Sequence, residues 1–406
     1  MSGQAPLAGV RVVDMTQVVV GPYATAIMAD HGADVIKIET AGGDLARTIG
    51  GKGRSAGMGP KFLHLNRNKR SMQLDLKQPA GMEAMHRLLK TADVLIYNVR
   101  PPAMARLGLA YEDACRIRPD IVYCGMYGFG QDGRYRAKPA YDSIIQGSTG
   151  FAALYHRATG TPRYLPMVIA DRTAGLMALN MVMLALFHRA RTGEGQKIDV
   201  PMFENMAALV LAEHMYLKTY VPPIGQAGDP RLLDPESRPL ETKDGFVCIT
   251  ANTNAQAFGL FDAMGRPDMK TDPKYSTTLA RFENVREYYA IRAEAMKRRT
   301  TAEWIEILDK ADVPCMPYHT LDSLMEDPHL ADVGLIEEID HPTEGRLKSL
   351  RVANRLSRFT PSLERHAPHL GEQSVAMLRE LGFSQAEIDA MIASGATNDG
   401  RPKASA

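Results

Sequence analysis

The sequence predicts an α/β fold with a doubly wound parallel sheet. In the first third of the chain, short β-like runs alternate with helical segments, and these helices are long enough for the crossovers between parallel strands. The composition is that of an ordinary globular protein, with 45% hydrophobic and 23% charged residues. A chain of 406 residues can bury a large core and suits two or three domains.

The first elements follow one another closely. A strand is predicted at residues 10–14, and Gly21 and Pro22 open the helix that follows it. Proline suits a first helical turn because its missing N–H has no intrahelical partner there. Further strands are predicted at residues 34–39, 71–75, 94–98 and 121–127, with helices at residues 81–92 and 111–117.

After Gly150 the pattern changes. The sequence predicts a long apolar helix at residues 174–191, then a turn and a strand up to residue 200, and a second apolar helix at residues 202–217. Residues 221–238 are rich in proline, glycine and aspartate, which predicts a boundary loop.

A different unit is expected beyond this loop. It has a strand at residues 245–251 and helices near residues 254–264, 284–297 and 301–311, and from about residue 335 the chain returns to strand-like and polar segments. Two capping-box patterns predict helix starts, at Thr300 with Glu303 and at Ser384 with Glu387.

The charges nearly balance, with 48 Lys and Arg, 47 Asp and Glu, and a net charge of +1. Such a surface has no global basic field for nucleic acid, so a polyanionic ligand must be bound by a local cluster. The four cysteines show no CxxC spacing, which indicates reduced thiols rather than disulfides or a zinc site.

No secretory signal is visible ahead of the first strand. The longest near-apolar run, residues 174–187, is interrupted by Asn180 and is too short to span a bilayer, so we interpret it as a buried core helix. These features predict a cytoplasmic protein with no membrane partner.

Residues 128–133 match the pattern GxGxxG directly after a predicted strand. A dinucleotide-binding fingerprint requires the third glycine to enter a helix. Gly133 is followed instead by charged residues and Pro139, which do not favour an immediate helix. We therefore interpret this segment as a flexible glycine loop, with a lid over a substrate as the alternative.

Basic residues gather in the loops beside the predicted strands. In a doubly wound sheet, the loops beyond the carboxyl ends of the strands converge on one crevice, where such side chains can hold several phosphates. The simpler interpretation is that they are solvated surface charges. They are Arg67, Lys69, Arg70, Lys77, Arg100, Arg106, Arg134, Arg136 and Lys138.

The sequence contains no pattern for a triad hydrolase or a zinc enzyme. Residues 147–150 are not a GxSxG elbow, and the eleven histidines show no HExxH spacing. No metal is therefore expected.

Asp171 is the carboxylate that stands out, between a strand-like run and the long apolar helix. The simplest interpretation is a helix N-cap, a position that aspartate fills well. The alternative is a nucleophile, because free N–H groups at a helix start can stabilise the oxyanion of an acyl intermediate. The local sequence alone favours the cap.

Several segments, in order along the chain, carry a resemblance to a known family. They are GPYATAIMADHGADVIKIE, NRNKRSMQLDLK, ADVLIYNVRPPAMARLGL, YDSIIQGSTG, IADRTAG, RTGEGQKIDVPMFE, PHLGEQS and LGFSQAEIDAM. Together they resemble the class III CoA-transferases, which include formyl-CoA:oxalate CoA-transferase and are related to the α-methylacyl-CoA racemases. The likeness covers nearly the whole chain.

The resemblance implies a large Rossmann-like domain made of residues 1–222 and 331–406, with a smaller α/β domain at residues 223–330 inserted between them. It implies an interlocked homodimer without a permanently bound cofactor. The implied substrates are a coenzyme A thioester and a carboxylic acid.

The resemblance also implies that Asp171 is a catalytic nucleophile, which carries first an acyl group and then CoA. Contacts to CoA are implied for Val18, Val19, Leu74, Lys77, Asn98, Val99, Arg106 and Lys138. Tyr141 and Asp142 fall where the family lines its reaction centre.

The chain departs from the formyl-CoA enzyme at several positions. Val19 replaces a glutamine, Thr40 replaces an arginine near the adenine nucleotide, and the tetraglycine loop has no counterpart. These changes weaken the case for oxalate and formyl-CoA. The acyl group stays open, with succinyl-CoA as a donor that the family suggests.

Three other functions remain open: a 2-methylacyl-CoA racemase, a CoA-dependent dehydratase and a non-catalytic acyl-CoA-binding protein. The related racemases pair the aspartate with a histidine, so that two groups handle the α-proton. The matching position here is Tyr141, and an ordinary tyrosine, with a pKa near 10, is a poor base at neutral pH. Transfer is therefore favoured over racemisation.

Overall fold

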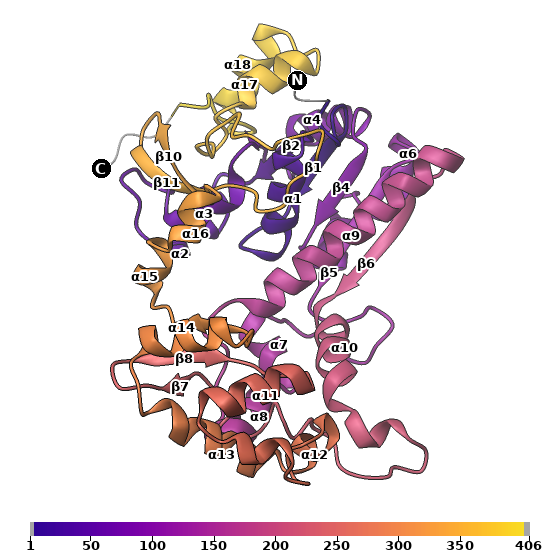
Figure 1. The fold of residues 1–406 in the computed structure, drawn as a ribbon. Coiled ribbons are helices and arrows are strands. Elements are labelled where there is room, and N and C mark those ends of the chain that lie inside the picture. The colour runs from indigo at the N-terminus through magenta and orange to yellow at the C-terminus, as the bar shows by residue number, and fades with distance from the viewer. Residues whose placement is uncertain (1–3, 402–406) are drawn as a thin grey trace. The chain divides into compact units, whose positions relative to one another are not determined.

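The structure is a computed structural model that describes residues 4–401. The described chain divides into two compact units (Figure 1). The first contains the residues up to 149, residues 166–207 and the residues from 329 onward. The second contains residues 150–165 and 208–328. The second unit therefore includes a helix, α8 (Phe151–Thr159), that the sequence analysis assigned to the large domain.

A six-stranded parallel sheet forms the centre of the first unit, so the predicted α/β class with a parallel sheet is confirmed. The order across the sheet is β3-β2-β1-β4-β5-β6. The strands are β1 (Arg11–Met15), β2 (Asp34–Glu39), β3 (Arg70–Gln73), β4 (Val94–Tyr97), β5 (Val122–Tyr127) and β6 (Gln196–Pro201). Since chain order reverses between β1 and β4, the loops that follow these two strands flank a crevice at the carboxyl edge.

Helices pack on both faces of this sheet. One face holds α1 (Val20–Asp30) and α9 (Ile169–Thr192), which contact each other. The other face is an apolar core between the strands and α4 (Pro79–Leu89), α5 (Pro101–Arg106) and α6 (Tyr111–Ile117). Because helices cover both faces of the sheet, side chains on both faces of a central strand are buried. All four residues of β4 are buried, and the strand is accordingly apolar along its whole length.

Helix α9 differs from the buried core helix that the sequence predicts. Its 24 residues, Ile169–Thr192, extend beyond the predicted run of residues 174–187, and by length and composition alone they could cross a membrane, a test that core helices of soluble proteins also pass. One face of the helix is buried and consists mainly of small residues, among them Ala174, Gly175 and Ala178. The opposite face is exposed, and Leu184 and Phe187 there are 61% and 62% accessible.

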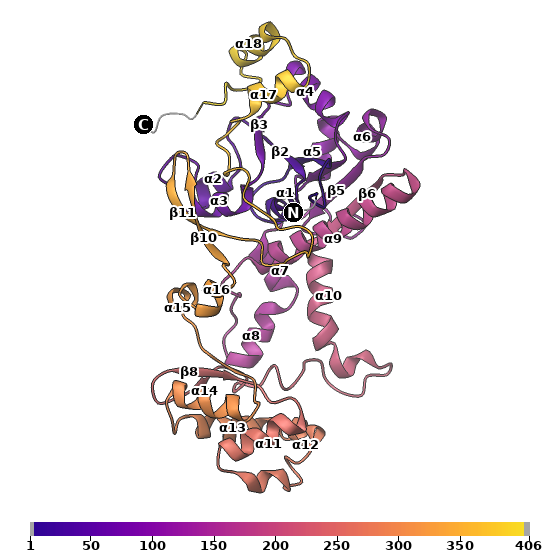
Figure 2. The ribbon, with the colours of Figure 1, turned by 45° about the horizontal axis from the view of Figure 1, so that its top comes forward.

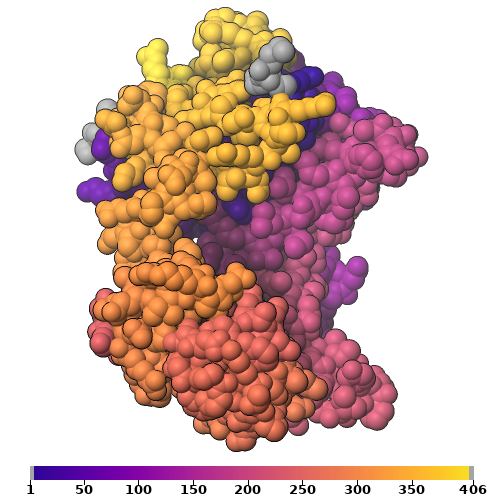
Figure 3. All heavy atoms as spheres, in the orientation of Figure 1, coloured from indigo at the N-terminus to yellow at the C-terminus, as the bar shows by residue number. Residues whose placement is uncertain are grey.

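The C-terminal residues return to the free edge of β3. Gln73 donates its N–H to Ser374 Oγ at 3.0 Å and accepts from Thr397 Oγ1 at 2.8 Å. Helix α17 (Ser374–Glu380) lies beside β3 and α4 in Figure 2, and α18 (Gln385–Ala393) adds apolar side chains to the core. In Figure 3 these residues, in yellow, form part of the surface of the first unit.

The remaining elements of the first unit are short helices and a hairpin. They are α2 (Ala46–Ile49), α3 (Pro60–Asn66), α7 (Asp142–Ser148) and the antiparallel pair β10 (Ile336–His341) and β11 (Gly345–Leu350). Helix α10 (Met202–His214) begins in the first unit and ends in the second, and α16 (Pro328–Asp332) lies at the return to the first.

The second unit has its own apolar core, with Trp304 and Phe261 fully buried. Its antiparallel sheet consists of β7 (Leu240–Glu241), β8 (Phe246–Ile249) and β9 (Cys315–Pro317). Its helices are α8, α11 (Asn254–Ala263), α12 (Thr278–Glu283), α13 (Val285–Met296), α14 (Thr301–Lys310) and α15 (Leu321–Met325), with the 3₁₀ turns Tyr216–Thr219 and Pro267–Lys270. Both predicted capping boxes are present, at α14 and at α18.

Candidate active site

A cavity of about 650 Å³ lies in the first unit where the loops after β1 and β4 meet. Residues 17–20 line it from the end of β1, and residues between 98 and 106 line it from the end of β4. The end of β5 and the following loop, between residues 126 and 141, form another wall, and Asp171 is exposed to the same space. This is the crevice at which doubly wound sheets bind their ligands.

One side chain joins the two loops at the crevice. Asn98 Oδ1 accepts the N–H of Gln17 at 3.0 Å, and Asn98 Nδ2 donates to the Gln17 carbonyl at 2.9 Å. A side-chain amide that pairs with both backbone groups of one residue fixes the separation of two loops that are far apart in sequence. Asn98 therefore builds the cavity as well as lining it.

Asp171 occupies the first turn of α9 but does not cap it. The N-cap residue is Val168, without a side-chain cap hydrogen bond, and Asp171 is the third residue of the helix. The helix-cap interpretation of Asp171 is therefore wrong. The capping acceptor is Asp142, whose Oδ1 accepts the N–H groups of Ala170 at 2.8 Å and Asp171 at 3.2 Å.

The side-chain carboxylate of Asp171 is left without a hydrogen-bond donor among residues 4–401. Burial, and then the neighbouring carboxylate of Asp142, raise the pKa of Asp171 to about 7, although Lys61 and Arg172 act to lower it. A carboxylate with a raised pKa and no hydrogen bonds is a stronger nucleophile than an ordinary aspartate.

Gly175 brings the start of α9 against the start of α1. A Cβ atom on Gly175 would lie 2.6 Å from the carbonyl oxygen of Val20, so only glycine permits this approach without a shift. Gly175 is four residues after Asp171 and shares its side of the helix. The contact therefore sets Asp171 beside the turn of residues 17–20, and both line the cavity.

Cationic side chains surround the rest of the cavity. Arg100, Arg106, Arg136 and Lys138 line it, all are exposed, and within the described chain none of them forms an ion pair. The ammonium of Lys138 lies 4.5 Å from the ring centre of Tyr135. About half of the other arginines of the first unit are paired with carboxylates, as Arg70 is with Asp34 at 2.6 Å. This set can therefore bind several phosphate or carboxylate groups.

The structure brings together most of the residues predicted for the site and separates three of them. The side chain of Leu74 is buried in the core, Lys77 is exposed at the turn after β3, and Asp142 is buried behind the start of α9. None of these three lines the cavity. Those that do are Val18, Val19, Asn98, Val99, Arg106, Lys138, Tyr141 and Asp171.

The segment at residues 128–133 is a loop, as predicted, and no helix starts until α7. Gly130 donates its N–H to Glu204 Oε1 at 2.9 Å, and a Cβ atom there would lie 2.6 Å from that oxygen. Gly130 therefore allows the close contact with Glu204. Gly128 and Phe129 of the same loop line the cavity.

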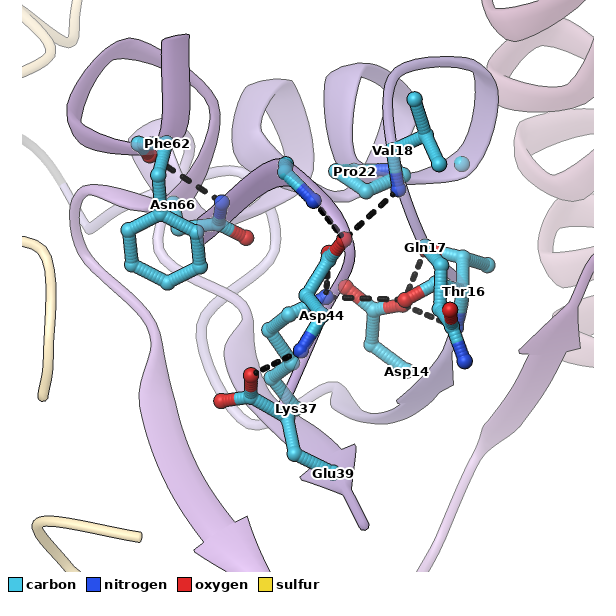
Figure 4. A network of polar contacts seen from close by, with 12 residues as sticks. Asp14, Thr16, Gln17, Val18, Pro22, Lys37, Glu39, Asp44, Phe62 and Asn66 are labelled. Carbon is cyan, nitrogen blue, oxygen red and sulfur yellow. Dashed lines mark hydrogen bonds and ion pairs between the residues drawn. The ribbon is translucent and has the colours of Figure 1, made fainter. Parts of the chain in front are cut away.

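Sequence reasoning missed a group of buried charges under the turn of residues 17–20. Asp14, Lys37, Asp44 and Lys69 are each at most 1% accessible. Figure 4 shows the first three beside the turn. The available signal was the presence of Asp14 and Lys37 inside strands that a doubly wound sheet covers on both faces. Within the described chain, no group of three or more His, Cys, Asp or Glu is placed to hold a metal ion.

Comparison with known proteins gives a consistent result. The model of CoA-transferase family III matches residues 7–374. Succinyl-CoA:glutarate CoA-transferase from Mus musculus is 31% identical over 398 residues, which cover 96% of this chain and 90% of the relative. Formyl-CoA:oxalate CoA-transferase from Rhodopseudomonas palustris is 33% identical over 427 residues, covering 98% of this chain and 99% of the relative.

A solved structure agrees with these sequences. The crystal structure of a CaiB/BaiF family protein from Brucella suis is 30% identical, with a TM-score of 0.77, and the match covers 93% of this chain and all of that one.

Proposed function

The chain belongs to CoA-transferase family III and transfers CoA from an acyl-CoA to a carboxylic acid, and we propose that Asp171 is the nucleophile of this transfer. The observation that supports this proposal is the environment of the Asp171 carboxylate. It lies in the cavity without hydrogen-bond donors among the described residues, and its pKa is raised to about 7.

The first half of the proposed reaction moves CoA onto the enzyme. The Asp171 carboxylate attacks the carbonyl carbon of the donor thioester, and the C–S bond breaks, which gives a mixed anhydride and free CoA thiolate. The thiolate then attacks the carboxyl carbon of Asp171 and expels the donor carboxylate. The product is an aspartyl-CoA thioester.

The second half reverses these steps with the acceptor. Its carboxylate attacks the aspartyl thioester and releases CoA thiolate, which then attacks the acceptor carbonyl of the new anhydride. The products are the new acyl-CoA and free Asp171. Neither half consumes water, so the energy of the thioester is conserved if the cavity keeps water from the intermediates.

The CoA moiety is expected along the carboxyl edge of the sheet. Arg106 and Lys138 would pair with its phosphates, and Val18, Val19, Asn98 and Val99 would line the arm that leads to the thioester. Tyr141 would stand at the reaction centre. Asp142 supports Asp171 from behind the helix, while Leu74 and Lys77 could meet CoA only outside this cavity.

We infer that the acyl groups are dicarboxylic, with succinyl-CoA as the donor and an acid such as glutarate as the acceptor. Two relatives named for succinate and glutarate, from Mus musculus and Agrobacterium fabrum, support this choice. Arg100 and Arg136 add two unpaired cations to the cavity beyond those assigned to CoA. A distal carboxylate on the acyl group would pair with such a cation.

We further propose that the protein is an interlocked homodimer. The exposed face of α9 carries Leu176, Met177, Met181, Leu184 and Phe187, and the last four of these recur every three or four residues as one apolar stripe. A second copy of the chain would cover this stripe. We also expect a cytoplasmic location, because the cysteines of the described chain are all free thiols.

The covalent mechanism is tested by trapping. Protein is incubated with succinyl-CoA and hydroxylamine, which converts a reactive aspartyl acyl group into a hydroxamate, and the peptides are analysed by mass spectrometry. We expect a hydroxamate on Asp171. Turnover without any modification of Asp171 would contradict the covalent mechanism.

Asp171→Ala and Asp332→Ala form the matched pair of variants for this experiment. Asp332 is exposed and lies outside the cavity. Asp171→Ala should abolish transfer and leave CoA binding nearly unchanged, while Asp332→Ala should transfer CoA and be trapped at Asp171 like the natural protein.

A further inference from the structure

The turn after β1 contains a backbone conformation that needs support. Val18 has a φ of 68°, in the left-handed region. This region crowds the Cβ of any residue but glycine, and most of all that of a β-branched residue. Val18 also lines the cavity beside Asp171. An unfavourable conformation at such a place persists only where the surrounding structure holds it.

Asp44 holds Val18 directly. Its Oδ1 accepts the N–H of Val18 at 2.9 Å (Figure 4). The same oxygen of Asp44 accepts the N–H of Ala46 at 2.8 Å. Its Oδ2 lies 2.7 Å from the ammonium of Lys37, and neither side chain is accessible to solvent. A carboxylate buried in this way cannot exchange its donors for water, so the bond to Val18 is fixed.

Lys37 extends the support to the preceding residue. Its ammonium donates to the carbonyl oxygen of Thr16 at 2.8 Å. Burial acts to lower the pKa of Lys37, but Asp44, Asp14 and Glu39 together raise it, so the amine stays charged. One lysine therefore links the Asp44 carboxylate to the backbone of the turn.

Asp14 holds the turn from the other side. Its Oδ1 accepts the N–H of Thr16 at 2.9 Å, and its Oδ2 lies 3.1 Å from the ammonium of Lys69. The charges of Asp14 and Asp44 are thus each matched by a lysine, and the carboxylates bond the N–H groups of Thr16 and Val18. The side chain of Asn98 accepts the N–H of Gln17 in the same way. Side-chain oxygens therefore accept the N–H groups of three successive residues, Thr16, Gln17 and Val18.

We propose that Asp44 is a positioning residue for this transferase: by holding Val18 in the left-handed conformation, it fixes the cavity wall that receives the CoA thioester beside Asp171. The proposal rests on the proposed function of the cavity. Without Asp44, the backbone at Val18 relaxes to an ordinary conformation, and CoA binds only to the fraction of molecules in which the turn is formed.

A double-mutant cycle tests this role, with CoA itself as the probe in a calorimetric titration of the full-length protein. The variants are Asp44→Ala, Val18→Gly and the two combined. Glycine adopts the left-handed conformation without strain and needs no carboxylate to hold it there. We therefore expect Asp44→Ala to weaken CoA binding roughly tenfold or more when residue 18 is valine, and less than about twofold when it is glycine.

Two results would overturn the proposal. One is an Asp44→Ala protein that binds CoA as tightly as the natural protein. The other is an equal loss of affinity with valine and with glycine at residue 18, which would mean that Asp44 acts independently of this conformation. If Asp44→Ala does not fold, Asp44→Leu combined with Lys37→Met is used in the same cycle, because this pair also removes the acceptor for the Val18 N–H and leaves neither partner of the buried ion pair unpaired.

Leu88→Ala is the control for a general loss of stability. Leu88, a residue of α4, is fully buried in the apolar core and does not line the cavity. It should lower the melting temperature and leave CoA affinity unchanged. Failure of the natural protein to bind CoA would contradict the proposed function, whereas normal binding with equal losses in the cycle would contradict only the role of Asp44.

Discussion

The carboxylate of Asp142 accepts the backbone N–H of Asp171 at 3.2 Å and at the same time raises the pKa of the Asp171 side chain. The Asp142 carboxylate, 29 positions earlier in the chain, thus attracts the backbone N–H of Asp171 and repels the negative charge of its side chain. The arrangement fixes the first turn of α9 and leaves the proposed nucleophile, the Asp171 carboxylate, without hydrogen-bond donors among the described residues.

The rate of transfer should depend on the protonation of Asp171. In the proposed mechanism only the ionised carboxylate attacks, and the pKa of Asp171 is raised to about 7. We expect kcat/KM to fall about tenfold per pH unit below 7 and to level off above it. A pH–rate profile with saturating acceptor measures this, and a profile that is flat from pH 5 to 8 would contradict it.

Asp142→Asn should move that profile to lower pH. The asparagine oxygen can still accept the two N–H groups at the start of α9, but the charge that raises the pKa of Asp171 is removed. We expect the midpoint to shift down by up to about one pH unit, since burial remains as the larger cause. An unchanged midpoint would mean that Asp142 acts only through the helix.

Asp171→Asn should stabilise the protein above neutral pH. The folded-state pKa of about 7 lies above the ordinary aspartate value of 3.8, so the native state favours the protonated form of Asp171. Ionisation therefore costs stability, and this cost grows from about pH 4 to pH 7 and is constant above. The variant should gain up to ~4 kcal/mol at pH 8 and little at pH 4, measured by urea unfolding. Asp332→Asn, at an exposed residue, is the control and should gain little at either pH.

Gly175→Ala should lower stability and activity together. The added methyl group meets the Val20 carbonyl at 2.6 Å and must force α9 away from α1. We expect a loss of about 1–3 kcal/mol and a lower kcat/KM, because Asp171 moves relative to the turn. Gly259→Ala meets a carbonyl at the same distance, that of Ala311, in the second unit. It should lose similar stability, and equal losses of activity in both variants would contradict the specific role of Gly175.

Charges on the exposed face of α9 should prevent assembly of the proposed dimer. Leu184 and Phe187 are more than half accessible, and glutamate at both positions would place two charges in the interface. Light scattering after size-exclusion chromatography should show the mass of a single chain. Leu279→Glu, at a residue of the second unit that is 67% accessible, is the control and should leave the mass unchanged. A natural protein that elutes as a single chain would contradict the dimer.

The sheet was predictable because its strands are short apolar runs between helices of regular length. The predicted strand at residues 34–39 coincides with β2, and that at residues 121–127 with β5 to within one residue. Local signals also located the starts of α14 and α18, where serine or threonine caps the helix. Such features depend on neighbouring residues, which the sequence displays directly.

The contacts that build the site were not predictable in this way. The distance along the chain from Asp142 to Ala170 is 28 residues, and that from Asp44 to Val18 is 26. No local pattern connects such partners. The local sequence therefore predicted Asp171 as the helix cap, whereas in the structure the side chain of Asp142 accepts the N–H groups at the start of α9. The ordered resemblance to a family pointed to Asp171 where its neighbours could not.

The edge strand β3 is covered by the last residues of the described chain, and this has a consequence for synthesis on the ribosome. Gln73 cannot bond Ser374 or Thr397 until some three hundred further residues have been translated, including the whole second unit. During that time the nascent sheet has an open edge, which invites pairing with other chains. A chaperone that shields β3 would be needed most while the second unit is being made, and a stop codon that removes α17 and α18 would leave that edge open permanently.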